Sequence, residues 1–394
     1  MTESFDAIVV GLGAMGSATV LELAKKGLKV LGIDRLAPPH SLGSSHGDTR
    51  ITRRAIGEGE VYSPFSMRSY ELFHDLEDKV NETLVVKTGG LILGNKAKSA
   101  AINHTFDFLK NTLTAANKYQ IEHEVLEAKD IRRRFPQFKV DDDEIAYYEF
   151  GASILRPEMI IKAQLAVAKE LGAVIHTNET VLSFEETNTC VQVKTSVGVY
   201  EGEQIVLSCG PWLNGMVPDL ENAFKVYRQI LYWFDVSESY DNFQVGQMPI
   251  FIWQLKGHDH GIYGFPAVDG KNGGFKIASE NYDQITSPDK VRREVDTDEI
   301  QKMYNDKVAP YFPRVKNKCI KAVVCMYTVT DDSAFVIDYL PSSKRILICS
   351  PCSGHGFKHS AAVGETVAEL LLTGSSTLNI SAFKLNRLLE DKSL

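Results

Sequence analysis

The chain has 394 residues, of which 44% are hydrophobic and 24% are charged. These fractions are typical of a globular protein and exclude collagen-like, disulfide-scaffold and disordered chains. No apolar run reaches the roughly 18 residues that a membrane-spanning helix needs. The formal net charge of −8 argues against a sequence-independent grip on nucleic acid. Because the length exceeds the roughly 250–300 residues at which single cores stop growing, we expect two domains.

The six cysteines are unevenly spaced and do not resemble the disulfide framework of a small secreted protein. Cys349 and Cys352 form a C-x-x-C pair, but no second Cys or His pair stands at zinc spacing, so we expect no metal site. The first residues lack the pattern of a secretory signal. We therefore expect a reducing, cytoplasmic location.

The first 34 residues predict a strand, a helix and a second strand that ends in Asp34. The turn between the first strand and the helix contains three glycines, Gly11, Gly13 and Gly16. Such a turn lets a pyrophosphate approach the N-terminus of the helix, and an acidic residue after the second strand accepts hydrogen bonds from ribose. The pattern predicts a dinucleotide site without choosing NAD or FAD; the alternative is a glycine turn needed only for packing.

Later segments repeat the pattern of an apolar strand followed by glycine, which predicts a Rossmann-like α/β domain assembled from separate parts of the chain. Strand signals between these parts predict a second, α+β domain on a mainly antiparallel sheet. We expect residues 1–85, 148–215 and 320–394 in the nucleotide domain, and 86–147 and 216–319 in the second. Strands are predicted at 204–210, 345–350, 87–94, 225–236, 261–268 and 273–279, and helices at 100–120, 158–172 and 360–374.

Residues 37–65 are polar and rich in Gly, Pro, Ser and Arg. Within nine residues this segment holds His46, Asp48, Thr49, Arg50, Arg53 and Arg54. The planar guanidinium forks of two arginines suit a carboxylate, so the cluster is a candidate substrate site. The alternative is a surface loop in which Asp48 and Glu58 pair with the arginines.

Two late segments carry chemically useful residues. Cys325 lies in an apolar strand, where a lone cysteine is more often an inert small hydrophobe. The glycine-rich run SGHGFKHS leads into the last predicted helix and contains Lys358. That turn either favours a bound anion or is a plain helix entry with a solvated lysine.

Together these pieces resemble the flavin-dependent amine oxidases typified by monomeric sarcosine oxidase and N-methyltryptophan oxidase. The matching segments are FDAIVVGLGAMGSA, PPHSLGSSHGDTRITRRAIGEGEVY, IYGFPA, GGFKIA, AVVCMYT, FVIDYLP and SGHGFKHS, which run from the first strand to the last helix. The resemblance implies FAD rather than NAD, bound by a domain of the glutathione-reductase type.

The resemblance also implies roles for individual residues. Cys325 is expected to join the flavin covalently, with Lys358 and the last helix as candidates for lowering its pKa. Arg53 and Lys358 are expected to hold the substrate carboxylate, and Lys276 to activate dioxygen through a water. Arg50 and Thr49 are expected at the flavin face, His46 near the covalent link, and Tyr263 and Tyr327 at the substrate. The expected cofactor contacts are Gly11, Gly13, Gly16, Asp34, Arg35, Ser44, Gly354, Gly356 and Lys358.

One position departs from the family pattern. In the oxidases that the chain resembles, a histidine stands four residues after the lysine that activates oxygen, whereas this chain has Glu280. An anion there is expected to repel a second carboxylate and to favour an amine or another cation.

The expected activity is oxidation of the C–N bond of a secondary, N-methyl or cyclic, amino acid. The imine product hydrolyses, and O2 is reduced to H2O2. One alternative is a flavin dehydrogenase of similar fold that passes electrons to another acceptor; another is a nucleotide-binding protein without turnover. We expect a monomer whose partners are a small amino acid and O2, with neither nucleic acid nor membrane.

Overall fold

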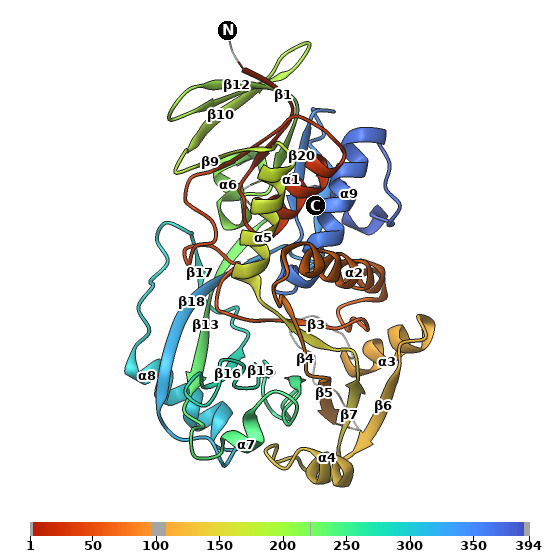
Figure 1. The fold of residues 1–394 in the computed structure, drawn as a ribbon. Helices are drawn as coiled ribbons and strands as arrows, with labels where there is room; N and C mark the ends of the chain where they lie inside the picture. Colours follow the sequence, from red (N-terminus) through yellow and green to blue (C-terminus); the bar gives the residue numbers. More distant parts are fainter. Residues whose placement is uncertain (1–2, 96–107, 221, 390–394) are drawn as a thin grey trace.

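The computed structural model describes residues 3–95, 108–220 and 222–389. Two large β-sheets lie one above the other in Figure 1, and the chain passes between them several times. A small third sheet lies where the two large ones meet. This arrangement brings segments from many parts of the sequence to a single region between the sheets.

The upper sheet of Figure 1 has eight strands. They are β1 (Glu3–Val10), β2 (Val30–Asp34), β9 (Val174–Thr177), β10 (Val181–Glu186), β11 (Val191–Thr195), β12 (Val199–Leu207), β19 (Val336–Tyr339) and β20 (Ile346–Ser350). Its centre is parallel, since β1 pairs with β2 and β12, β2 with β9, and β12 with β20. Strands β2 and β20 are buried along their whole length, which explains why both are apolar runs without alternation.

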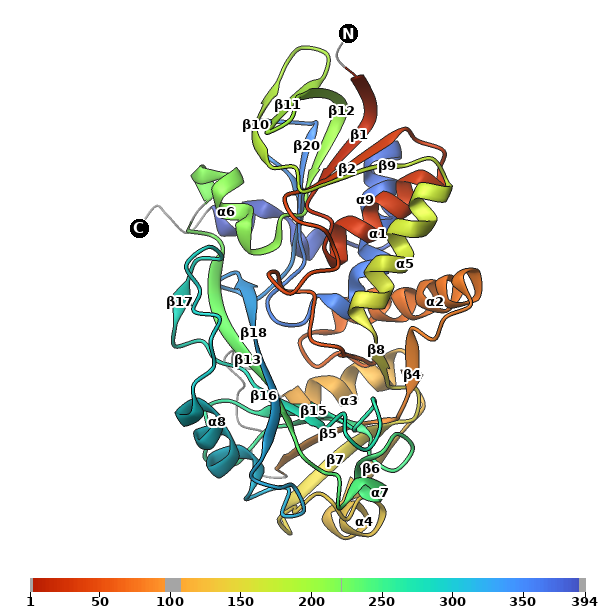
Figure 2. The ribbon, with the colours of Figure 1, turned by 60° about the vertical axis from the view of Figure 1, so that its left-hand side comes forward.

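Helices cover one face of this sheet, where α1, α5 and α9 lie side by side (Figure 2). The helices of this part are α1 (Ala14–Lys25), α2 (Ser63–Val80), α5 (Pro157–Glu170) and α9 (Ser360–Thr373). Helices α1 and α9 approach each other closely because α9 has Gly364 at the contact. A Cβ atom at that position would lie 2.6 Å from the carbonyl carbon of Ala18 in α1.

The lower sheet has nine strands and is antiparallel except where β14 pairs with β5. They are β5 (Gly90–Asn95), β6 (His123–Glu127), β7 (Glu144–Glu149), β13 (Lys225–Phe234), β14 (Ile250–Trp253), β15 (Ile262–Phe265), β16 (Phe275–Ser279), β17 (Ile285–Thr286) and β18 (Cys319–Val329). Its helices are α3 (Phe108–Lys118), α4 (Ala128–Arg134), α7 (Tyr240–Phe243) and α8 (Thr297–Met303). A separate aromatic core, with Phe251, Trp253 and Phe312 at its centre, stabilises this part.

The third sheet consists of β3 (Arg50–Thr52), β8 (Ser153–Leu155) and β4 (Val85–Lys87), in that order. Strand β3 therefore carries the arginine-rich segment to the junction of the two large sheets (Figure 1). The remaining helical turns are α6 (Leu213–Met216), a π-helical turn Tyr304–Val308, and 3-10 turns at Glu60–Tyr62, Gly210–Trp212, Pro218–Leu220, Phe357–His359, Ser381–Phe383 and Leu385–Leu388.

The expected fold class is confirmed, with a parallel Rossmann-type sheet and a second, mainly antiparallel one. The expected boundary at residue 320 does not match the sheets, because β18 pairs with β13 in the lower sheet and the chain returns to the upper sheet only at β19. An apolar strand does not by itself reveal which sheet it joins. The helix predicted at 100–120 is α3; residues 100–107 lie outside the described part of the chain.

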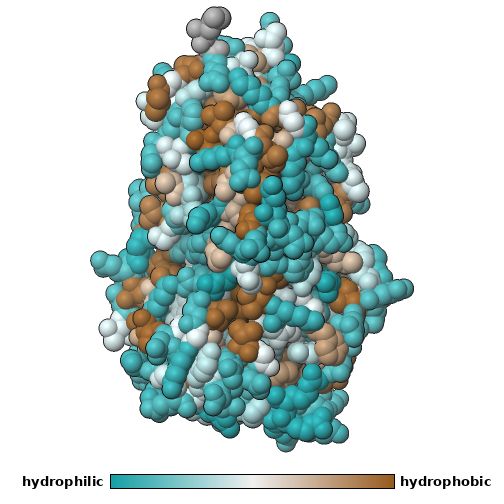
Figure 3. Space-filling view, viewed as in Figure 1, coloured by the Kyte–Doolittle hydropathy of each residue, from teal (hydrophilic) through white to brown (hydrophobic). Residues whose placement is uncertain are grey.

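The face shown in Figure 3 is mainly hydrophilic, and its hydrophobic residues occur in small groups. In the described ranges, no helix is both long enough and apolar enough to cross a membrane. Scattered exposed apolar residues of this kind are ordinary for protein surfaces.

Replacing Gly364 by Ala should destabilise the protein, because the added methyl group forces α9 away from the α1 backbone. Overpacking of this kind costs about 1–3 kcal/mol. Thermal melting of the cofactor-loaded protein measures the effect. Gly198→Ala is the matched control, since the nearest atom to its Cβ position is the Tyr200 hydroxyl, 3.9 Å away. Equal melting temperatures for the two variants would contradict close packing of α1 on α9.

Candidate active site

A cavity of about 680 Å³ lies at the junction of the sheets. Its wall draws on the glycine turn after β1, the arginine-rich segment around β3, strands β15 and β18, and the glycine-rich turn before α9. Of the residues expected at the site, those lining the cavity are Gly11, Gly13, Asp34, Arg35, Ser44, Thr49, Arg50, Arg53, Tyr263, Glu280, Cys325, Tyr327, Gly354, Gly356 and Lys358. Gly16, His46 and Lys276 lie behind this wall.

The first glycine turn has the geometry that a dinucleotide needs. Gly11 has a φ of +87°, and a Cβ there would lie 2.7 Å from the Ser208 carbonyl oxygen. A Cβ at Gly16 would lie 1.8 Å from the Gly11 carbonyl oxygen. Gly13 precedes α1 and has no side chain that could cap the helix. The Ala14 N–H donates to the Ser45 hydroxyl at 3.3 Å, and the positive end of the helix still faces the cavity, where it favours a phosphate.

Asp34 fits the place of a ribose acceptor. Its carboxylate accepts hydrogen bonds from the backbone N–H groups of Leu12 (2.7 Å) and Leu36 (2.8 Å), which fix its orientation. Each carboxylate oxygen has a further lone pair available for a hydroxyl group. Arg35 lies beside it, with its guanidinium over the Trp212 ring and 3.3 Å from the Asp289 carboxylate.

Arg50 organises the loop that precedes it. Its guanidinium donates to the carbonyl oxygens of Thr49 and Ser44, both at 2.8 Å. Burial, reinforced by Arg50, lowers the pKa of His46 to about 3, so this imidazole is neutral. His46 Nε2 and Ser44 Oγ are buried polar atoms without a hydrogen-bond partner among the described residues. Unpaired polar atoms beside a cavity indicate a ligand with polar groups of its own.

Lys276 is 2% exposed and donates to the carbonyl oxygens of Gly47 (2.6 Å) and Thr49 (3.0 Å) and to the Thr49 hydroxyl (2.9 Å). Burial lowers the pKa of this lysine well below its usual value, and Arg50 lowers it further, whereas the carboxylates of Asp48 and Glu158 raise it. The amino group of Lys276 is thus removed from water and held by three acceptor oxygens next to Thr49 in the cavity wall.

Cys325 differs from the other cysteines at the cavity. Its sulfur lies 3.9 Å from an Arg50 nitrogen and 3.6 Å from the Ser44 carbonyl oxygen. Burial raises the pKa of Cys349 to about 12 and also raises that of Cys352, so these thiols stay protonated. The cation in contact with Cys325 is therefore Arg50, whereas Lys358, expected from the sequence, contacts Glu58 instead.

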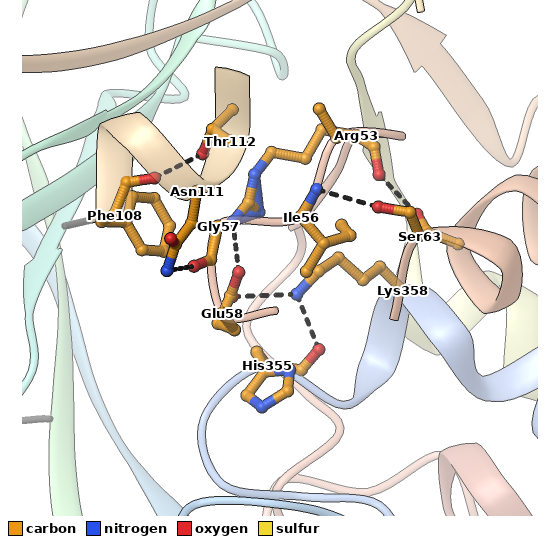
Figure 4. A network of polar contacts seen from close by, with 12 residues as sticks. Arg53, Ile56, Gly57, Glu58, Ser63, Phe108, Asn111, Thr112, His355 and Lys358 are labelled. Carbon is orange, nitrogen blue, oxygen red and sulfur yellow. Dashed lines mark hydrogen bonds and ion pairs between the residues drawn. The ribbon is translucent and has the colours of Figure 1, made fainter. Parts of the chain in front are cut away.

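Arg53 and Lys358 converge on one carboxylate, as Figure 4 shows. That carboxylate belongs to Glu58, which is 2.6 Å from Arg53 Nη2 and 3.4 Å from Lys358 Nζ. Lys358 also donates to the His355 carbonyl oxygen at 2.7 Å. Arg54, the neighbouring arginine, lies over the Tyr70 ring instead.

The charges of this trio stabilise one another. Burial raises the pKa of Glu58, but Arg53 and Lys358 outweigh burial and hold the pKa well below its usual value. Burial lowers the pKa of Lys358 to about 8 despite the opposing effect of Glu58. Glu58 is therefore ionised at neutral pH, and the two cations grip a carboxylate inside the cavity.

Tyrosines and a second glutamate form the adjoining wall. The hydroxyl groups of Tyr263 and Tyr327 are 3.1 Å apart. Glu280 follows β16, and the neighbouring Tyr282 hydroxyl acts to lower its pKa. Burial, reinforced by the charge of Glu58, raises the pKa of Glu280 to about 7.

Three residues that contribute to the site were not expected there from the sequence. Glu58 was expected only as a possible partner of the arginines in a surface loop, and no role was expected for Tyr282. Glu158 in α5 accepts hydrogen bonds from the N–H groups of Gly47 (2.6 Å) and Asp48 (3.1 Å), and so holds the loop that binds Lys276. Because Glu158 is 111 residues from Gly47, no local pattern could have indicated this contact.

In the described part of the chain, no group of three or more His, Cys, Asp or Glu side chains is arranged to hold a metal ion. The cavity instead has the N-terminus of α1 with its glycine turn, the acidic residue Asp34 in the place of a ribose acceptor, unpaired polar atoms and a cluster of cations. These features fit a dinucleotide with a reactive ring at its other end.

Similarity to known proteins supports a dinucleotide site in this cavity. Residues 6–370 match the family model described as DAO, FAD dependent oxidoreductase. A monomeric sarcosine oxidase of Bacillus sp. (strain NS-129) is 38% identical over 98% of both chains. An N-methyl-L-tryptophan oxidase of Salmonella dublin is 32% identical over 97% of this chain and 99% of its own.

Among solved structures, NikD, described as an unusual amino acid oxidase essential for nikkomycin biosynthesis, superposes with a TM-score of 0.82. It is 21% identical and covers 97% of this chain and 98% of its own, so this likeness supports the fold alone. The family model and the two curated relatives span the whole architecture, from the glycine turn to the last helix. The chain therefore belongs to the FAD dependent oxidoreductase family.

Proposed function

We propose that the protein oxidises the C–N bond of a secondary amino acid, N-methyl or cyclic, in the manner of a sarcosine oxidase. The products are an imine, which water converts to an aldehyde and an amine, and H2O2 formed from O2. The relatives named above support this reaction type. The observation that carries the proposal is the pair of buried cations, Arg53 and Lys358, that already grips a carboxylate in the cavity.

When bound, FAD supplies the acceptor for the two electrons that leave the substrate. The residues that would hold its nucleotide half are the glycines of the first turn, with Asp34 and Arg35. Ser44, Arg50 and Cys325 would meet the flavin end, and we propose a covalent thioether through Cys325. The place of Cys325 supports that choice, because it lines the cavity and its sulfur lies 3.9 Å from an Arg50 nitrogen at the proposed flavin end.

Arg53 and Lys358 would orient the substrate by its carboxylate. Since the Glu58 carboxylate occupies the space between them, it acts as a stand-in for the substrate carboxylate and has to withdraw when the substrate binds. A ligand carboxylate then replaces one ion pair by another, so neither cation is left unpaired. Two fixed cations restrict the rotation of the substrate and so direct its C–N bond.

Lys276 would act in the half-reaction in which O2 is reduced. Its three hydrogen bonds to the 47–49 loop keep the ammonium group in one place, next to Thr49 and Arg50 in the cavity wall. A preorganised positive charge stabilises the negative charge that develops on oxygen as it is reduced. Glu158 and Asp48 favour the charged form of this lysine.

Cys325→Ser should release the flavin on acid precipitation, whereas wild-type protein should precipitate yellow. Serine lacks the nucleophilic thiolate, so it forms no thioether. The absorbance of the supernatant measures the released cofactor. Cys352→Ser is the matched control, because Cys352 also lines the cavity but has a raised pKa. Free flavin in the wild-type supernatant would contradict covalent attachment.

Lys276→Met should slow the reoxidation of the reduced enzyme by O2 by about 10²–10³-fold, the usual effect of removing one preorganised charge. Anaerobic reduction by substrate should change far less. Stopped-flow spectroscopy separates the two half-reactions, and peroxide yield under air distinguishes an oxidase from a dehydrogenase. Lys321→Met, which removes an exposed lysine paired with Asp48, is the control. An equal loss in both half-reactions would exclude the proposed role of Lys276.

Glu58→Gln should lower the free energy of unfolding by about 3–5 kcal/mol, because it leaves two buried cations without an anion. Acetate should restore part of this stability by occupying the place of the carboxylate. Because folding lowers the pKa of Glu58 below its usual 4.5, the stabilisation by wild-type Glu58 is full above pH 4.5 and is lost as pH falls through the folded-state pKa.

Melting temperatures with and without acetate measure this rescue. Glu60→Gln is the control, since Glu60 pairs with Lys118 at the surface. If acetate raises the melting temperature of Glu58→Gln no more than that of the wild type, the cations do not form a carboxylate site.

A further inference from the structure

Glu280 has no assigned partner in the chemistry described so far. It stands directly after β16, four residues beyond Lys276, and therefore continues the face of the strand that carries Lys276. Its side chain lines the cavity, together with those of Tyr263, Tyr282 and Tyr327. A carboxylate at this place faces whatever ligand fills the space next to Arg53 and Lys358.

The carboxylates that line the cavity differ in the groups that stabilise their negative charge. Glu58 lies between two cations, and Asp34 accepts two backbone hydrogen bonds. Glu280 has the Tyr282 hydroxyl, and the cation that lowers its pKa, Lys358, makes its ion pair with Glu58 and none with Glu280 among the described residues. Glu280 is half-buried, and a ligand that supplies a cation would stabilise the ionised form of such a carboxylate.

The surroundings of Glu280 suit an organic cation. The rings of three tyrosines border the same part of the cavity, and the Tyr282 ring meets Tyr227 edge-on at a centroid distance of 5.4 Å. Aromatic faces attract ammonium and guanidinium groups, and a bound cation would lower the pKa of the carboxyl group among the rings and so favour its negative charge. The wall therefore combines the two features that recognise an amine or a guanidine.

The cation that Glu280 would bind is not the reacting amine alone. Glu280 lies on the cavity wall apart from the ion pairs of Arg53 and Lys358, which would hold the substrate carboxylate. A second cationic group, carried by the side chain of the substrate, matches a carboxylate in that place. The ligand would then bear a carboxylate at Arg53 and Lys358 and a second charge, of positive sign, at the tyrosine wall.

We propose that the substrate is a dibasic secondary amino acid, whose side chain carries an amine or guanidine that binds Glu280 among Tyr263, Tyr282 and Tyr327. This inference rests on the proposed function, since it names the substrate class for the same cavity. Glu280 would then determine which substrate binds and would take no part in the transfer of electrons.

The test compares substrates that differ only in the distal charge. Nα-methyl-lysine and N-methylnorleucine have side chains of similar length, but only the first carries an amine. Wild-type holoenzyme should oxidise Nα-methyl-lysine with at least about a tenfold higher kcat/KM, the effect of one charge-assisted hydrogen bond. Glu280→Gln should bring the ratio close to one, because it removes the charge that distinguishes the two substrates.

Two further variants sharpen the comparison. Asp283→Asn removes an exposed carboxylate three residues away that does not line the cavity, and it should leave the ratio unchanged. Glu280→His introduces the residue of the resembling oxidases and should shift preference toward sarcosine. Binding of L-lysine and L-norleucine, followed by the flavin absorbance, gives the same comparison without turnover; lysine should bind more tightly, and only to proteins that keep Glu280.

The outcomes separate the two proposals. Equal kcat/KM for the two N-methyl substrates in the wild type would overturn the dibasic inference and leave the proposed function standing. A loss of both activities in Glu280→Gln to the same extent would also overturn it, since Glu280 would then act on the reacting amine. If no secondary amino acid reduces the flavin, the proposed function fails, and the binding comparison alone decides whether Glu280 recognises a cation.

Discussion

The site depends on keeping cations charged after their removal from water. Arg53, Lys276 and Lys358 are all buried, and burial disfavours the charged form of each lysine. The fold offsets this cost in two ways. Glu58 supplies a full negative charge to Arg53 and Lys358, whereas Lys276 receives two carbonyl oxygens and one hydroxyl oxygen. The first arrangement can be displaced by a ligand, and the second cannot.

This difference matches the two roles proposed for these cations, which are to bind the substrate and to stabilise oxygen as it is reduced. In the proposed function, the ion pairs of Arg53 and Lys358 exchange the Glu58 carboxylate for that of the substrate. A lysine whose three donors are all held by one loop stays in place, which suits a charge that must be ready before oxygen arrives. Glu158, on α5, stabilises that loop from the side of the parallel sheet, so the positioning of Lys276 involves both large sheets.

Much of the fold could be predicted from local patterns of residue type along the sequence. The strand, glycine turn and strand at the N-terminus form as predicted, because Gly11 and Gly16 occupy positions where a side chain would collide with backbone. The sheet that β18 joins could not be predicted, since its apolar sequence is equally compatible with either sheet. Only the pairing with β13 decides that β18 belongs to the lower sheet. The roles expected for the site residues, the monomeric state and the cytoplasmic location stay predictions.

The sequence by itself determined the dinucleotide turn, the arginine-rich segment and the presence of a carboxylate at position 280, because each depends on residue type and on spacing over a few positions. Only the tertiary structure decided which charges meet. Glu58 reaches Lys358 across 300 residues, and Arg50 reaches Cys325 across 275. Such pairs arise from the crossing of distant segments between two sheets. Electrostatic energy depends on distance and burial, and neither is encoded locally along the chain.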